Sequence, residues 1–142
     1  MTRHEAFERV TRLGGDPPSP FEEPFGFSRV VRADELVLVG GTTSIEPSGA
    51  IIGETPYEQT VAILRKIGHE LSRAGASLHD VVQTRVYTTD ISRAEEIGRA
   101  HEQGFSSSPP VMTMVEVSAL IDPRMMVEIE AMALVPERGP VA

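Results

Sequence analysis

The stretch MMVEIEAM, residues 125–132, decides the fold of this chain. Successive side chains of a β-strand point to opposite faces, so the alternation of this stretch predicts a strand with two different faces. One face carries Met126, Glu128, Glu130 and Met132, and the opposite face is wholly apolar. Solvent would favour lysine, threonine and glutamine, and a core would exclude the acids. The mixed Met/Glu face therefore suits neither bulk solvent nor an ordinary hydrophobic core.

The stretch VMTMVEV, residues 111–117, predicts a second strand of the same type. Its alternation separates Met112, Met114 and Glu116 from the valines and Thr113. We expect these Met/Glu residues to share the open face of the sheet with those of residues 125–132.

The elements upstream complete an α+β fold. Further strands are predicted at 27–33, 36–41, 51–52 and 80–88. Thr55 as the N-cap, followed by Pro56 and Glu58, predicts the start of a helix that ends at Gly75. The segment SRAE, residues 92–95, predicts a second capping box and helix.

The resulting order is β-β-β-α-β-α-β-β, a mixed sheet with two helices on one face. The apolar strand faces suit the helices, and no predicted element is left to cover the Met/Glu faces. A half-apolar sheet face of this size is expected to be buried by another subunit.

The chain divides into three parts by composition. Residues 1–24 contain HEAFERVTRLGG, which predicts a short amphipathic helix through Leu13, and then the proline-rich linker DPPSPFEEP. This part is expected to dock on the main domain or on a neighbouring chain. Residues 25–136 form the main domain, and residues 137–142 form a C-terminal tail.

Composition excludes several classes of function. The 142 residues include 13 basic and 21 acidic side chains, a formal net charge of −8, with no clustered basic patch. This balance argues against a nucleic-acid or membrane partner. The chain has no cysteine, no apolar signal region in its first 25 residues, and no run long enough to span a bilayer. We therefore expect a cytoplasmic protein.

The remaining motifs do not predict a metal or a nucleophilic serine. The four histidines, at positions 4, 69, 79 and 101, lack metal-ligand spacing, and the serines at 106–108 lack a nucleophile elbow. The segment VGGTTS, residues 39–44, lacks the lysine and the helix of a P-loop, which favours a bulge or a close ligand approach. Thr42 and Thr43 are equally suited to binding a ligand and to capping the strand end.

Three segments resemble the RidA/YjgF reactive-intermediate deaminases, a family with the chorismate-mutase-like fold. They are VGGTTSIEPSGAIIG (39–53), AGASLHDVVQTRVYTTDI (74–91) and PPVMTMVEVSALIDPRMMVEIEAMA (109–133), and the match extends from 26 to about 135. The resemblance implies a homotrimer in which the open sheet faces form a central barrel and a small-molecule cleft lies at each subunit interface. It also implies hydrolysis of enamines and imines such as 2-aminoacrylate, without a metal or cofactor.

The resemblance assigns a catalytic and a binding role to particular positions. The glutamate that orients the attacking water falls at Glu128. The family's carboxylate-binding arginine falls at Met112, so the substrate is expected to be less anionic than usual, unless Arg29 or Arg124 supplies the missing cation. The ligand-binding positions of the family fall at Phe27, Gly40, Gly41, Thr42, Gly98, Met112 and Met114.

Two interpretations of the acids stay open. A poorly solvated Glu128 would have a raised pKa suited to a general base, or it would be an interface glutamate satisfied by backbone N–H groups or by an arginine. Glu116 and Glu130 are better suited to subunit contacts or a solvated rim, with Arg85, Arg99 or Arg124 as partners. The resemblance accordingly implies a hydrolase of imines, enamines or related molecules, with a non-catalytic metabolite-binding or interaction module as the alternative. RNA cleavage fits the acidic charge least well.

Overall fold

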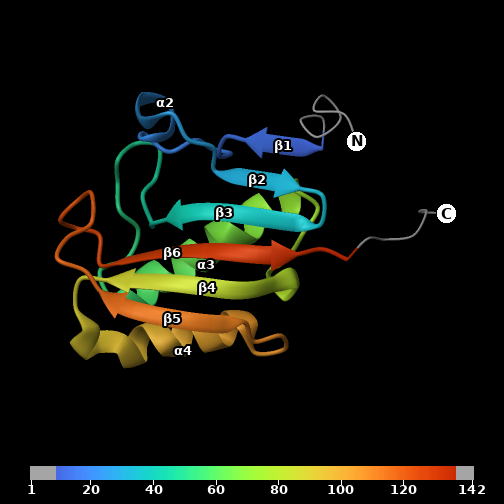
Figure 1. Ribbon diagram of the computed structural model, residues 1–142. Coiled ribbons are helices and arrows are strands. Elements are labelled where there is room, and N and C mark those ends of the chain that lie inside the picture. The colour runs from blue at the N-terminus through green and yellow to red at the C-terminus, as the bar shows by residue number, and fades with distance from the viewer. Residues whose placement is uncertain (1–8, 137–142) are drawn as a thin grey trace.

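The computed structural model describes residues 9–136, and the centre of the fold is one six-stranded mixed sheet (Figure 1). The strand order is β1-β2-β3-β6-β4-β5, with β4 and β5 parallel and the other neighbours antiparallel. The strands are β1 (Val10–Leu13), β2 (Val30–Ala33), β3 (Leu36–Thr42), β4 (Val81–Thr88), β5 (Val111–Glu116) and β6 (Val127–Leu134).

Two long helices cover one face of this sheet, as predicted. They are α3 (Pro56–Arg73) and α4 (Ala94–Phe105), and a short helix α2 (Glu22–Phe25) lies beyond the β1–β2 edge. Short 3₁₀ turns η1 (Leu78–Asp80) and η2 (Ile91–Arg93) flank β4. The α+β architecture with a mixed sheet is therefore confirmed. The predicted strand at 51–52 is reduced to one isolated bridge between Ile45 and Ile51.

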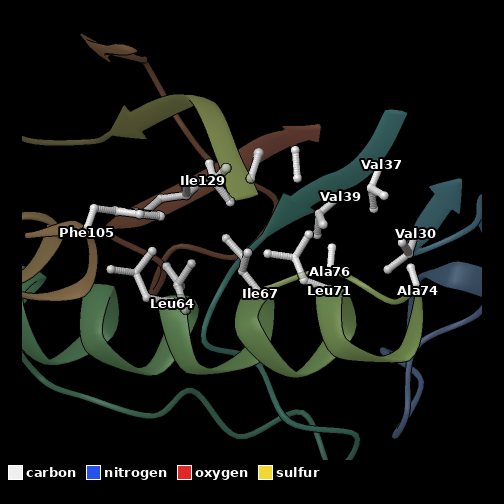
Figure 2. Packing of buried hydrophobic residues seen from close by; sticks show 14 of the residues in the cluster. Val30, Val37, Val39, Leu64, Ile67, Leu71, Ala74, Ala76, Phe105 and Ile129 are labelled. Carbon is white, nitrogen blue, oxygen red and sulfur yellow. The ribbon is translucent and has the colours of Figure 1, made fainter. Parts of the chain in front are cut away.

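The hydrophobic core lies between the sheet and these helices (Figure 2). Ile67 and Leu71 of α3, Phe105 of α4 and Ile129 of β6 are all at most 2% exposed. Burying an aliphatic or aromatic side chain of this size contributes about 1.5–3 kcal/mol, so the apolar faces of β3, β4 and β6 hold the helices in place. The open face of the sheet keeps half-exposed residues, including Leu38, Met132 and Leu134.

The first long helix begins and ends as the sequence predicts. The Thr55 hydroxyl accepts a hydrogen bond from the Glu58 N–H at 3.1 Å, and Gly75 adopts a positive φ of 81° after the last turn. The Glu58 carboxylate accepts from the Glu54 N–H at 2.8 Å, one residue earlier than a capping box requires.

The predicted start of the second long helix is wrong. Asp90, rather than Ser92, caps this region, because its carboxylate accepts the Ser92 N–H at 3.0 Å and starts η2 first. Helix α4 then begins at Ala94 without a side-chain cap.

The predicted N-terminal helix is also wrong where it overlaps the described residues. Val10–Leu13 is strand β1, paired antiparallel with Val30–Ala33. The β-branched Val10 and Thr11 suit a strand, and the unpaired edge of β2 supplies the backbone partners that a short isolated helix lacks. Residues 1–8 and the predicted tail 137–142 lie outside the described residues.

The predicted orientation of strand β5 is wrong as well. Its parallel pairing with β4 places Met112 beside Thr84 and Met114 beside Val86. Both β4 residues are fully buried under the helices, and paired residues share a sheet face. Met112, Met114 and Glu116 therefore face the helix side, whereas Glu128 and Glu130 of β6 face the open side as predicted.

Candidate functional site

A cavity of about 820 Å³ lies beside the end of β3 and contains Glu128 in its lining. Three parts of the chain build it: the segment before β2, the segment after β3, and one side of α3. The loop before β6 closes it with Ile121 and Met125. The size is that of a small-molecule site, and the lining mixes aromatic side chains with buried charges.

Glu128 is held at this place by strand register and by a missing side chain. The pairing of β3 with β6 shifts register between Val39 and Thr42, which lets Gly41 lie against Glu128. A Cβ on Gly41 would stand 3.1 Å from the Glu128 Cδ, closer than an ordinary contact. A glycine is therefore needed here for close approach and not for an unusual backbone angle.

The surroundings of the Glu128 carboxylate favour its protonated form and raise its pKa. Burial raises its pKa, the nearby Arg29 lowers it, and Glu130 raises it, with a net upward shift. Within residues 9–136 no group donates a hydrogen bond to this carboxylate. A half-buried carboxylate with a raised pKa and unused oxygens is suited to general-base work.

Arg29 is the principal buried cation of the cavity, only 8% exposed. Its Nη1 donates to the Gly41 carbonyl at 2.6 Å, to Thr42 Oγ1 at 3.0 Å and to the Gly40 carbonyl at 3.3 Å. Its guanidinium also lies 5.4 Å from the centre of the Phe27 ring, a cation–π distance. Its Nε and Nη2 donate to no described residue, which leaves three of its five N–H groups unused.

Glu22 ties the segment before β2 to the site. Its two carboxylate oxygens accept from the N–H groups of Gly15 and Ser19, each at 2.6 Å, and Oε2 lies 4.0 Å from Arg29 Nε. Burial alone would raise the pKa of Glu22, but these donors outweigh it and lower the pKa. The predicted linker is therefore an ordered wall of the cavity.

A second anchor joins this wall to α3. The Asp16 N–H donates to the Glu70 carboxylate at 3.0 Å, and Glu70 is also paired with Arg73. For the described residues of this part, docking on the main domain, one of the two predicted alternatives, is observed.

Lys66 of α3 also lines the cavity and is the only lysine of the chain. Its Nζ donates to the carbonyls of Thr43 and Ile45 at 2.6 and 2.8 Å. Burial, together with the charge of Arg29, lowers its pKa to about 8.

The structure brings some of the sequence-predicted site residues together and separates others. Phe27, Gly41, Thr42 and Glu128 line the cavity, and Gly40 contributes its carbonyl to Arg29. Three do not line it in this chain: Met112 and Met114 lie on β5, and Gly98 lies on α4 with open space around its Cα.

Several contributors to the site were missed by sequence reasoning. Lys66 and Glu22 were not selected, and Arg29 was named only as a possible replacement cation. A single lysine among twelve arginines was the signal for Lys66. Arg124, the other arginine named, binds Asp122 and the Gly49 carbonyl on an exposed loop instead.

Two further findings concern the described residues alone. Among them, no three or more histidine, aspartate or glutamate side chains are grouped so as to hold a metal ion. No helix in residues 9–136 has both the length and the apolar character to cross a bilayer.

Comparison with known proteins places this chain in a family. The family described as Endoribonuclease L-PSP matches residues 21–135. A crystal structure from Mycobacterium tuberculosis, of a member of the YjgF/YER057c/UK114 family, is 47% identical with a TM-score of 0.80. It covers 89% of this chain and 99% of the other.

Two further relatives match over about two thirds or more of this chain. A RutC family protein of Pyrococcus abyssi is 33% identical over 114 residues, covering 78% of this chain and 88% of its own. The chloroplastic Reactive Intermediate Deaminase A of Arabidopsis thaliana is 26% identical over 95 residues, covering 66% of this chain and 51% of its own.

Proposed function

The chain belongs to the YjgF/RidA family, and from this premise we propose that it hydrolyses the carbon–nitrogen double bond of a small imine, or of the imine tautomer of a small enamine. The single observation that carries the proposal is Glu128, a carboxylate with a raised pKa and free oxygens in a cavity of small-molecule size. The reaction converts R₂C=NH and water into R₂C=O and ammonia.

Glu128 acts as the general base in this proposal. It accepts a proton from a water molecule as the oxygen attacks the imine carbon, and the electron pair of the double bond moves to nitrogen. The protonated carboxyl then returns this proton to nitrogen, which gives the tetrahedral intermediate R₂C(OH)NH₂. Glu128 next transfers the proton of the new hydroxyl to nitrogen, so that ammonia leaves as the carbonyl forms. Its raised pKa suits both directions of proton transfer.

The positive charge of Arg29 favours the binding of an anionic substrate in this cavity. The Arg29 Nε–H and the two N–H groups of Nη2 donate to no described residue, although Nε also lies 4.0 Å from Glu22 Oε2, and a carboxylate accepts such donors in pairs. This proposal replaces the expectation of a less anionic substrate, which rested on Met112 alone.

The test compares Glu128→Gln with Glu116→Gln in an assay that follows 2-oxo acid release from 2-aminoacrylate or 2-iminobutyrate. Glutamine cannot accept the proton, so the first variant is expected to lose about 10²–10⁴-fold in kcat, whereas the second retains wild-type activity. The wild-type rate should rise with pH through a midpoint above that of an ordinary glutamate.

A different outcome would identify the alternative function. If wild type releases no 2-oxo acid yet binds pyruvate, as followed by calorimetry, the chain is a non-catalytic metabolite-binding module. An RNA substrate is disfavoured, because the net charge of −8 opposes a polyanion.

Assembly as a homotrimer through the open sheet face is also part of the proposal. Leu38 is 40% exposed and Leu134 is 48% exposed on this face, and no described element of the chain covers them. Light scattering should give three chains per particle, and Leu38→Lys should weaken the assembly. A stable wild-type monomer at micromolar concentration would contradict this. A cytoplasmic location stays a prediction.

A further inference from the structure

The amine of Lys66 differs from an ordinary surface lysine in its position. Its side chain crosses from α3 to the segment after β3, where the carbonyls of Thr43 and Ile45 accept two of its hydrogens. It lines the same cavity as Arg29 and Glu128. The amine is therefore fixed in place and faces a space large enough for a small molecule.

The third hydrogen of the ammonium group has no such acceptor. An ammonium carries three N–H groups, and within residues 9–136 only the two carbonyls accept from Nζ. A neutral amine keeps two N–H groups and gains a lone pair. Loss of the third proton therefore preserves both hydrogen bonds and leaves the lone pair in the direction that no described acceptor occupies.

The groups around Lys66 have opposing effects on its pKa. Burial and Arg29 oppose the charged form, while Glu22, Glu70 and Glu46 favour it. The acids are partly engaged elsewhere: Glu22 by backbone N–H groups and Glu70 by Arg73. The net effect lowers the pKa of Lys66 to about 8, so the neutral amine is present near neutral pH.

We propose that Lys66 is a nucleophilic amine that captures small carbonyl compounds in this cavity as reversible imines. The nitrogen lone pair attacks the carbonyl carbon, the carbonyl oxygen leaves as water, and both amine hydrogens are lost to that water as a C=N bond forms. Desolvation next to another cation is a known way to make a lysine nucleophilic. Arg29 in the same lining favours carbonyl compounds that also bear a carboxylate.

The simpler alternative is that Lys66 only fastens the Thr43–Ile45 segment to α3. That role needs two hydrogen bonds and a positive charge, and an arginine can supply both. Nucleophilic capture needs an amine that loses its proton near pH 8 and is reachable from the cavity. Chemical trapping distinguishes these requirements directly.

The experiment incubates the full chain with pyruvate and sodium cyanoborohydride between pH 6 and pH 11, and maps the reduced adduct by peptide mass spectrometry. The matched control is Arg12→Lys, which adds a lysine at an exposed position of strand β1. At pH 7 the neutral fraction of an amine with a pKa of about 8 is roughly 300-fold larger than that of an ordinary lysine. We expect trapping at Lys66 to be at least about 10-fold faster than at the introduced lysine, with a midpoint near pH 8.

Two results would overturn the proposal. One is an adduct confined to the N-terminal amine, and the other is a Lys66 rate no greater than that of the lysine introduced by Arg12→Lys. Lys66→Arg should remove the adduct from the Lys66 peptide. Trapping is expected to persist in Glu128→Gln, so failure of the proposed imine hydrolysis and failure of Lys66 capture are read from separate measurements.

Discussion

Strands β5 and β6 carry almost the same alternation of methionine, glutamate and valine, yet their Met/Glu residues lie on opposite faces of one sheet. Strand β6 lies between β3 and β4 and buries its Val/Ile/Ala face completely. Strand β5 lies at the edge and buries no residue completely.

The difference shows what alternation does and does not determine. Alternation divides a strand into two faces, but burial decides which face turns inward, and register is weakly specified where neither face is buried. In β6 the helices select the apolar face. In β5 the parallel pairing with β4 determines which face turns toward the helices, and it places Met114 against the edge of the core.

The largest effect is expected in the core face of β6. Ile129 is 0% exposed and packs among the core residues, so Ile129→Ala should lower the free energy of unfolding by about 2–5 kcal/mol. Chemical denaturation monitored by circular dichroism measures this. A loss below 1 kcal/mol, on the order of a surface substitution, would mean that β6 is not the better buried strand.

A smaller effect is expected for the corresponding face of β5. Met114 is partly buried against the core, so Met114→Ala should cost about 1–2 kcal/mol. Its neighbour Thr113 is exposed on the other face, and Thr113→Ala serves as the control with a change within about 0.5 kcal/mol. The reverse order of the two costs would restore the orientation that alternation alone predicts.

The third prediction concerns Gly41, the glycine of β3 that leaves room for Glu128 of β6. Gly41→Ala places a methyl group 3.1 Å from the Glu128 Cδ and should displace the carboxylate, lowering kcat for imine hydrolysis by roughly 10-fold. Gly98→Ala is the matched control, because a Cβ there meets nothing within 4 Å. Equal activities of the two variants would show that the position of Glu128 tolerates this shift.

The smallest effect is expected for the glutamate of β5. Glu116 accepts a hydrogen bond from the Ile91 N–H at 3.1 Å on the exposed surface. Glu116→Gln keeps an acceptor at this position, so thermal unfolding should show a change within about 0.5 kcal/mol. A change of several kcal/mol would place Glu116 in a buried interface between chains.

The central fold could be predicted because its local sequence patterns agree with the tertiary structure. The Thr55 cap, the glycine at position 75 and the apolar face of β6 are local patterns that the tertiary structure reinforces. The orientation of β5 and the nature of β1 depend on pairing with distant strands, and no local pattern encodes that pairing.

Only part of the candidate site could be predicted from the sequence. Glu128 and Gly41 follow from the family resemblance, and a Cβ on Gly41 would stand 3.1 Å from the Glu128 Cδ. The hydrogen bonds that Glu22 accepts depend on the fold of the segment before β2, and those that Lys66 donates depend on the packing of α3 beside the end of β3.

The ordered segment containing Glu22 can influence which molecules bind in the cavity without contributing to the stability of the central core. This segment contributes Phe21 and Phe25 to the cavity but nothing to the central core cluster. Changes in its length or aromatic content can therefore alter which metabolites are admitted while the sheet and its two long helices persist. Such a division would let related proteins diversify their chemical targets through one short stretch of backbone.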